Sequence, residues 1–231
     1  MFEIPKNARQ EIKFVTNQYN YFQIISWIRM HPSNFSRSYD DRWINSIYFD
    51  SSNYQSYASN LSGQSARTKL RYRWYGKKRL PSAGQLELKN KRNYFGWKNT
   101  FKVNDDPFSD GDNWNNVKSK IASQLPKEAS HILKMYNFPI IINRYKRNYF
   151  CSVDKKIRIT VDRGQIVHDQ RFNSIPNLDK KANLPDTIVI EVKFNRDNFE
   201  LASDVMQGFP VRVSKHSKYI NAVDAISWNK V

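Results

Sequence analysis

Several short segments of the chain alternate a charged side chain with an apolar or aromatic one. The clearest are residues 69–73 (KLRYR), 85–89 (QLELK) and 190–194 (IEVKF). In a β-strand, side chains two residues apart lie on the same face. Each segment therefore places its charges on one face and its apolar residues on the other. Because these faces combine cations with occasional carboxylates, the pattern predicts an enclosed polar interior that holds a polyanion and a metal.

The spacing of apolar residues also predicts the other elements. Strands are expected over residues 9–15, 46–50, 66–75, 84–91, 140–150, 156–162 and 187–194, and helices over 18–30, 53–60, around 117–125 and 215–228. Asn17 is placed to cap the first helix. The segments 104–112 and 172–185 are polar and rich in turn residues, as in loops. Since antiparallel strands dominate, the expected fold is a single α+β domain over residues 1–231.

The net charge of the chain limits the classes of molecule that it is expected to bind. Lys and Arg number 38 against 21 Asp and Glu, which gives a net charge of +17. Such an excess favours nucleic acid, an anionic membrane or a polyphosphate-like substrate. The single cysteine, Cys151, excludes an internal disulfide and a cysteine-rich zinc site. No apolar run has membrane-spanning length and the first residues do not resemble a signal peptide, so we expect a cytoplasmic protein.

Phosphate would have to be bound by cationic side chains, because the chain has no Walker-type phosphate loop and its histidines lack metal-ligand spacing. Arg71 and Arg73 suit this task, since guanidinium groups bind phosphate oxygens in pairs and stay charged when desolvated. The alternative is a solvated basic face on an open sheet, as in RNA-binding proteins. Glutamates within the same faces argue against that alternative, because they repel phosphate unless a metal intervenes.

Glu191 is the first candidate for a metal ligand. It follows the apolar run 187–190, where a carboxylate needs a partner or a cation. The alternative is an ion pair with Lys193 or with an arginine of a neighbouring strand. Glu11 and Glu87 are further candidates, although Glu11 could lie near a sheet edge and Glu87 could balance Lys89.

In this order the motifs resemble the VTC domain, the polyphosphate polymerase domain of the vacuolar transporter chaperone complex, which also occurs as stand-alone bacterial proteins. The motifs that carry the resemblance are RQEIKF (9–14), SIYFD (46–50) followed by Tyr54 and Tyr57, KLRYRWYG (69–76), LELK (86–89), RYKRNYF (144–150), RITVD (158–162), IEVKF (190–194) and KHSKY (215–219). The family belongs to the triphosphate tunnel metalloenzymes. The resemblance therefore implies antiparallel strands closed into a barrel with a basic lumen.

The resemblance also implies roles for individual residues. The cations implied in catalysis are Arg71, Arg73, Lys89, Arg147, Arg158 and Lys193. Phosphate contacts are implied for Lys13, Tyr145, Lys215, Ser217 and Lys218, and the strand face adds Lys69. Glu191 matches the glutamate that holds a divalent metal, Mn²⁺ or Mg²⁺, with Glu87 and Glu11 beside it as further candidates. The implied reaction moves the γ-phosphoryl group of ATP onto a polyphosphate or pyrophosphate chain, and no specific nucleic acid is expected.

Two positions depart from the family pattern. Arg9 stands where the wider superfamily often has the first of two glutamates, which argues mildly against hydrolysis of tripolyphosphate or a nucleoside triphosphate. Asn60 stands where the polymerases tend to have a basic residue. Hydrolysis stays open as an alternative, as does a non-catalytic module that binds polyphosphate or RNA. Because the sensing domain and membrane spans of the eukaryotic subunits are missing here, any membrane coupling would need a separate membrane-protein partner.

Overall fold

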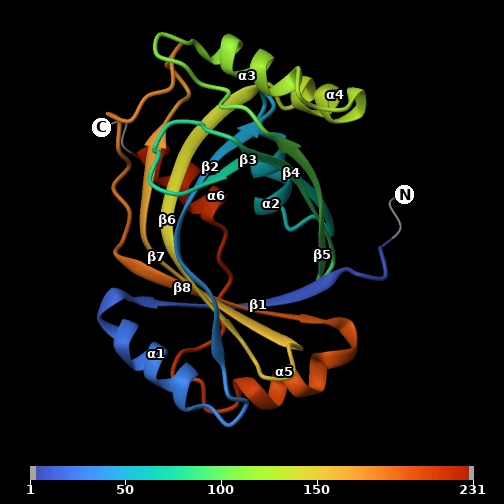
Figure 1. Cartoon of the computed structure of the whole chain (residues 1–231), viewed down its shortest axis with the longest axis vertical. Coiled ribbons are helices and arrows are strands. Elements are labelled where there is room, and N and C mark those ends of the chain that lie inside the picture. Colours follow the sequence, from blue (N-terminus) through green and yellow to red (C-terminus); the bar gives the residue numbers. More distant parts are fainter. Residues whose placement is uncertain (1–3, 229–231) are drawn as a thin grey trace.

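Eight antiparallel strands close into a ring in the computed structural model, which describes residues 4–228 (Figure 1). The strands are β1 (Arg9–Asn17), β2 (Ser36–Asp50), β3 (Ala66–Tyr75), β4 (Gly84–Arg92), β5 (Phe95–Val103), β6 (Phe138–Cys151), β7 (Ile157–Asp169) and β8 (Thr187–Asn195). The helices are α1 (Tyr21–Met30), α2 (Gln55–Leu61), α3 (Trp114–Ala122), α4 (Lys127–Met135), α5 (Phe199–Met206) and α6 (Lys218–Trp228), with short 3-10 turns at Gln18–Asn20 and Arg196–Asn198.

Around the ring the strands follow the order β1, β5, β4, β3, β2, β6, β7, β8. β1 pairs with β8 along its whole length, from Arg9 opposite Asn195 to Asn17 opposite Thr187. Its other edge meets β5 only where Arg9 lies opposite Gly96 and Gln10 opposite Phe95. The expected antiparallel barrel is therefore confirmed, and it closes over a short seam.

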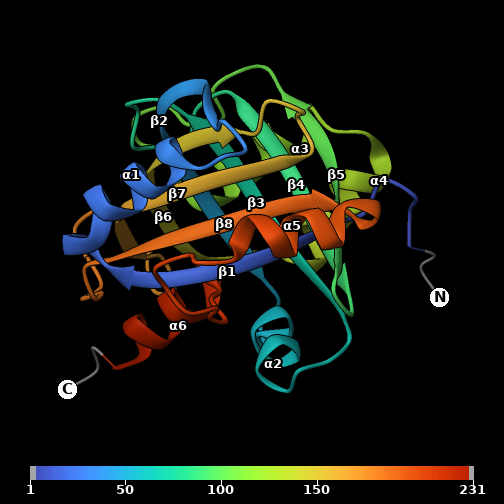
Figure 2. The ribbon, with the colours of Figure 1, turned by 90° about the horizontal axis from the view of Figure 1, so that it is seen from below.

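Helices α1, α3, α4 and α5 lie against the outer face of the ring, whereas α2 and α6 lie at one of its open ends (Figures 1 and 2). Helices α1 and α5 bury one apolar cluster against β1, β7 and β8, which includes Phe14, Ile28, Ile159, Val192 and Val205. Helices α3 and α4 bury a second cluster against β2, β3 and β4, which includes Ile47, Leu70, Trp74, Val117 and Leu133. Since neighbouring side chains on a strand point to opposite faces, the charged residues that alternate with these apolar ones point into the ring.

Asp50, at the end of β2, ties two helices to the ring. Its carboxylate accepts hydrogen bonds from the backbone N–H of Ser56 (2.9 Å) and of Tyr57 (3.2 Å) in α2. It also accepts one from the hydroxyl of Tyr219 in α6 (2.6 Å). Helix α6 further packs Tyr219 against Tyr48, with stacked rings 5.2 Å apart. These contacts fix the start of α6 beside the interior of the ring.

Some predicted boundaries were wrong. The second strand was expected over residues 46–50 but begins at Ser36, because its first half is polar and exposed and so lacks an apolar pattern. The elements β5, α4 and α5 were not predicted. Helix α6 begins at Lys218, so Lys215 and Ser217 lie before the helix rather than within it. Asn17 does act as a cap, since its side chain accepts a hydrogen bond from Tyr19 N at 3.2 Å.

The polar loops expected over 104–112 and 172–185 are confirmed, since neither contains a helix or strand beyond an isolated bridge at Lys181. None of the helices within residues 4–228 is long and apolar enough to cross a lipid bilayer.

Candidate active site

Strand register brings the predicted charges together inside the ring. Opposite charges face one another on neighbouring strands, with Lys13 paired to Glu191, Glu11 to Lys193, Arg71 to Glu87 and Arg147 to Asp162. The interior has two ends, which we name by the residues of β3 and β4. The first mouth lies where β3 begins and β4 ends, at Ala66 and Arg92. The second mouth lies where β3 ends and β4 begins, at Tyr75 and Gly84.

Glu191 is surrounded by cations. Its carboxylate lies 2.6 Å from Lys193 Nζ, 3.3 Å from Arg147 Nη2 and 3.4 Å from Lys218 Nζ. Lys13 Nζ is 3.8 Å away. Burial by itself raises the pKa of Glu191, but these cations hold it well below its usual range. Glu191 is therefore an anion within an ion-pair network, which was the alternative interpretation of this residue, and it keeps the charge that a metal ligand needs.

Asp162 is a central carboxylate that the sequence did not single out as a site residue. Arg147 binds it through two nitrogens, with Nη2 2.6 Å from Oδ2. Lys218 Nζ, from α6, lies 2.6 Å from the same oxygen. The sequence showed that Asp162 shares a strand face with Arg158 and Thr160, but the partners across the strands follow only from the register. Arg147 thus bridges Asp162 and Glu191.

A second buried carboxylate, Glu87, is fully buried between β3 and β5. Arg71 forms a close ion pair with it, and Lys98 Nζ lies 2.6 Å from Glu87 Oε1. Arg73 Nε is 3.8 Å away. Burial raises the pKa of Glu87, whereas Arg71, Arg73 and Lys98 lower it well below its usual range. This arrangement favours a structural role for Glu87 in orienting Arg71, rather than the metal-ligand role or the balance with Lys89 that the sequence suggested.

Lysines gather near the first mouth, on the β1, β3 and β4 side. Lys69 Nζ donates a hydrogen bond to Ser217 Oγ at 2.9 Å. Burial, together with the charges of Lys89 and Lys13, lowers the pKa of Lys69 to about 7. Glu11 raises the pKa of Lys89, but burial and Lys13 outweigh it and lower that pKa to about 8. These neighbouring lysines lower one another's pKa. Such a cluster is suited to binding a polyanion, because a nearby anion favours the protonated, charged form of each lysine.

The remaining predicted residues lie at the edges of this interior. Arg158 is exposed and lies near the second mouth. Burial lowers the pKa of Arg9 there, and the charge of Arg158 lowers it further. Lys215 is exposed near the first mouth. Burial lowers the pKa of Lys91, and the charges of Arg67, Lys13 and Lys215 lower it further. Tyr145 is buried and accepts a hydrogen bond from Arg73 Nη2 at 3.2 Å. Together with Arg147, Tyr145 therefore lines the central part of the ring.

Two buried polar side chains on the inner face have atoms without a hydrogen-bond partner among the described residues. Asn143, opposite Ser46, has neither its amide nitrogen nor its oxygen hydrogen-bonded among the described residues. Thr160, opposite Glu191, likewise leaves its hydroxyl without a partner within residues 4–228. A buried polar atom without a hydrogen bond is costly. Both positions therefore suit a polar ligand or water in the ring.

The donor set fits a divalent metal held jointly with substrate. Carboxylate oxygens are what Mg²⁺ and Mn²⁺ bind, and Mg²⁺ commonly takes one or two carboxylates together with substrate phosphates. Burial and the charge of Glu191 raise the pKa of Glu11, but the neighbouring lysines hold it well below its usual range, and Lys193 contacts both carboxylates. Within the described residues, no three His, Cys, Asp or Glu side chains form a metal cage. A metal here would depend on phosphate oxygens for the rest of its ligands.

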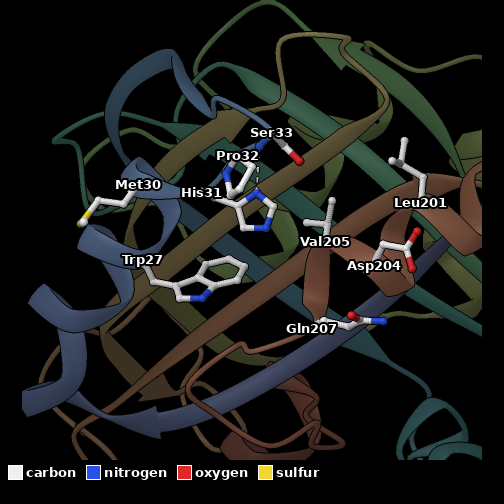
Figure 3. A pocket seen from close by; sticks show the side chains of 9 residues that line it. All are labelled: Trp27, Met30, His31, Pro32, Ser33, Leu201, Asp204, Val205 and Gln207. Carbon is white, nitrogen blue, oxygen red and sulfur yellow. Dashed lines mark hydrogen bonds between the residues drawn. The ribbon is translucent and has the colours of Figure 1, made fainter.

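A separate cavity of about 600 Å³ lies outside the ring, between α1 and α5 (Figure 3). Its walls include Trp27, Met30, Leu201 and Val205, and they are mainly apolar. His31 accepts a hydrogen bond from Ser33 N at 3.0 Å there. No lysine or arginine lines this cavity, so it is not the phosphate site that the sequence predicts.

Solved structures with a similar fold include proteins described as nucleotide cyclases. A protein from Hippeastrum, described as a putative adenylyl cyclase with a dominant triphosphatase activity, matches with a TM-score of 0.52 and 12% identity over 92% of this chain and 93% of that chain. A putative adenylate cyclase from Vibrio parahaemolyticus gives a TM-score of 0.52 and 12% identity over 96% and 99%. Comparison with curated proteins gave no match. At this identity the structural likeness shows the fold alone.

The sequence itself matches the VTC domain family over residues 8–227. That span contains every candidate residue from Glu11 to Lys218, and the resemblance predicted from the motifs is confirmed. The chain belongs to the VTC domain family.

Proposed function

We propose that this protein is a metal-dependent polyphosphate polymerase that transfers the γ-phosphoryl group of ATP to a polyphosphate chain inside the ring. The observation that carries the proposal is the excess of cations over carboxylates on the inner face of a closed sheet. The interior cations are Lys13, Lys69, Arg71, Arg73, Lys89, Lys98, Arg147, Lys193 and Lys218, against the carboxylates Glu11, Glu87, Asp162 and Glu191. Membership in the VTC family supports the same reaction.

Phosphoryl transfer needs little covalent chemistry from the protein. The reaction requires that donor and acceptor lie in line and that charge on the transferred group is neutralised. Arg71 and Arg147 are each held by a buried carboxylate, Glu87 and Asp162 respectively, so their guanidinium groups are fixed before substrate arrives. Preorganised charges of this kind stabilise a transition state without reorganisation. Lys69 and Lys89, which lack such fixed carboxylate partners at hydrogen-bond distance, would hold the flexible phosphate chain.

Glu191 is the residue we assign to hold the metal, with Glu11 beside it. A bound divalent ion would neutralise phosphate oxygens and draw them toward the same carboxylate. Lys193 and Lys218 now fill the space around Glu191 and would share it with the substrate's own anionic oxygens. Thr160 and Asn143 supply unpaired hydrogen-bonding groups for those oxygens.

Product analysis tests the proposal. The purified protein would be incubated with ATP and Mn²⁺, with and without pyrophosphate, and its products resolved on a gel that separates polyphosphates by length. We expect a ladder from the wild type that is lost in Glu191→Ala and in Arg71→Ala. Lys134→Ala, which removes an exposed lysine of α4 outside the ring, is the matched control and should leave the ladder intact. No phosphate product from the wild type would contradict an enzymatic role.

Hydrolysis of tripolyphosphate or a nucleoside triphosphate is the second candidate. The observation that favours it is the likeness to the Hippeastrum protein, whose description includes a triphosphatase activity. Arg9 argues against it, since a cation lies at the second mouth in the place of a carboxylate. The same gel separates the two candidates, because a hydrolase would release orthophosphate and make no long chains.

A further inference from the structure

The two mouths of the ring differ in chemistry. Near the first mouth the lining residues are Lys69, Lys89 and Lys13, and a hollow of about 400 Å³ beside it is lined by Arg67 and Lys91 among others. At the second mouth, interior-facing tyrosines come from three adjacent strands. They are Tyr39 of β2, Tyr75 of β3 and Tyr149 of β6.

These tyrosines lie on the inner face by register. Tyr149 is two residues beyond Arg147 and four beyond Tyr145, so the three share the inner face of β6. Tyr39 pairs directly with Tyr149, and their rings meet edge to face with centroids 5.5 Å apart. Tyr75 follows Arg73 on the inner face of β3. The register of β2 shifts on both sides of Tyr39, and such bulges re-aim side chains at the rims of barrels.

The tyrosines are also open to solvent and backed by an arginine. Tyr39 is 57% exposed and Tyr75 is 43% exposed. The guanidinium of Arg42 lies 4.6 Å from the centre of the Tyr39 ring and 5.7 Å from that of Tyr149. Exposed aromatic rings next to an arginine provide flat surfaces on which a base can stack. The three tyrosine rings are not part of a hydrophobic core, since none of them belongs to the apolar clusters of the described residues.

A continuous line joins this surface to the proposed phosphate site. Arg147 contacts Glu191, and its guanidinium lies 5.9 Å from the ring of Tyr149. Tyr149 lies two residues, or about 7 Å, further along β6 than Arg147, toward the second mouth. A nucleoside triphosphate with its phosphates at Arg73 and Arg147 would therefore reach Tyr149 and Tyr39 with its base. The opposite mouth would then receive the inorganic phosphate chain, where the lysines lie.

We propose that Tyr39, Tyr149 and Tyr75 form a stacking site for the base of the nucleotide donor, at the second mouth. The inference rests on the proposed function, because it takes a nucleoside triphosphate as the phosphoryl donor. Stacking tolerates any base, so the site selects nucleotides over inorganic phosphates but separates ATP from GTP weakly.

Two other aromatic residues, Tyr94 and Trp97, lie on the side of the first mouth. Tyr94, at the β4–β5 turn, is 81% exposed. Trp97 alternates with Lys98, whose amine reaches Glu87 inside the ring, so Trp97 lies on the outer face of β5, where it lines the hollow beside the first mouth. Neither residue continues a line of interior side chains, which is why we favour the second mouth.

Equilibrium binding of two ligands tests the site. Affinities would be measured for a non-hydrolysable ATP analogue and for tripolyphosphate, each with Mg²⁺, in wild type, Tyr39→Ala, Tyr39→Trp and Tyr94→Ala. We expect Tyr39→Ala to weaken the nucleotide about tenfold while tripolyphosphate changes less than about twofold, since stacking contributes to the base alone. Tyr39→Trp should retain nucleotide binding. Tyr94→Ala, the control at the other mouth, should change neither ligand.

The outcomes separate the inference from the proposed function. Equal losses for both ligands in Tyr39→Ala, or no loss for either, would overturn the stacking site even if the wild type makes polyphosphate. A selective loss of nucleotide in Tyr94→Ala would place the base at the first mouth and also overturn it. If the wild type binds neither ligand, the proposed function fails and the inference fails with it.

Discussion

Lys218, the first residue of α6, places its ammonium group 2.6 Å from the carboxylate of Asp162 on β7. A cation in the first turn opposes the helix dipole, so the helix itself does not explain the position of Lys218. Two buried carboxylates, Asp162 and Glu191, explain it instead, because they raise the pKa of Lys218 against the effect of burial. Helix α6 is thereby fastened to the centre of the ring.

Replacing this lysine should destabilise the fold. Lys218→Met keeps the length of the side chain but leaves Asp162 with Arg147 as its remaining strong partner. Removing one partner of a buried ion pair costs about 3–5 kcal/mol, and we expect about 3 kcal/mol because Arg147 remains. Urea unfolding would measure the change in the free energy of unfolding. A loss below about 1 kcal/mol would contradict the network, and Lys134→Met, on the outer surface, provides the control.

The attachment of α6 at Asp50 can be tested separately. Tyr219→Phe removes one hydroxyl that donates to a buried carboxylate at 2.6 Å and leaves the ring in place. A hydrogen bond to a charged group contributes about 1.5–3 kcal/mol, so we expect a loss of stability in that range. Tyr94→Phe removes an exposed hydroxyl and should be neutral. Equal stability of the two variants in thermal and chemical unfolding would show that the contact is not maintained in solution.

Substrate binding should take up protons above neutral pH. Burial and its lysine neighbours lower the pKa of Lys69 to about 7, so without a bound anion the amine of Lys69 is mostly neutral at pH 8. A bound phosphate favours the charged form and raises that pKa toward its ordinary value. Binding of tripolyphosphate at pH 8 should therefore take up about one proton, and affinity should fall as pH rises through 7 to 9.

Calorimetry in buffers of different ionisation enthalpy would count these protons. Lys69→Met should reduce the uptake, whereas Lys134→Met should leave it unchanged. Proton release on binding, or an uptake that is the same in wild type and Lys69→Met, would show that Lys69 is already charged in the empty ring.

Removing the metal should stop turnover and spare much of the binding. The interior cations provide most of the attraction for a polyanion, since they outnumber the interior carboxylates, whereas Glu191 without a metal repels it. We expect that EDTA abolishes polyphosphate synthesis while long-chain polyphosphate still binds, with an affinity that falls steeply as salt increases. Synthesis at an undiminished rate in EDTA would exclude the metal role of Glu191.

The sequence predicted the ring and most of its interior because alternation is a local property. The side chains of Lys69, Arg71 and Arg73 must share a face in any strand, and the structure confirms that face as the inner one. Which side chains pair across neighbouring strands is not a local property. That Arg71 meets Glu87, and that Lys98 meets it from the other side, depends on a register that no single segment encodes.

Missed elements have physical causes of the same kind. Strand β5 carries polar residues on both faces, such as Asn99 and Lys98, because one face lines the interior and the other is only partly covered. Tyr39 lies in the polar first half of β2 between two register shifts, and neither the strand nor the bulges leave an apolar pattern. The sequence did show that Asp162 shares a strand face with Arg158. Its ion pair with Lys218 could not be predicted, because that pair depends on where α6 lies.

Transfer of a labelled phosphoryl group tests the central claim most directly. The protein would be mixed with γ-³²P-labelled ATP, a divalent metal and pyrophosphate, and the first products separated before chains grow long. The account predicts label in tripolyphosphate for the wild type and none for Glu191→Ala. Label that appears only in orthophosphate, with pyrophosphate left unextended, would contradict it.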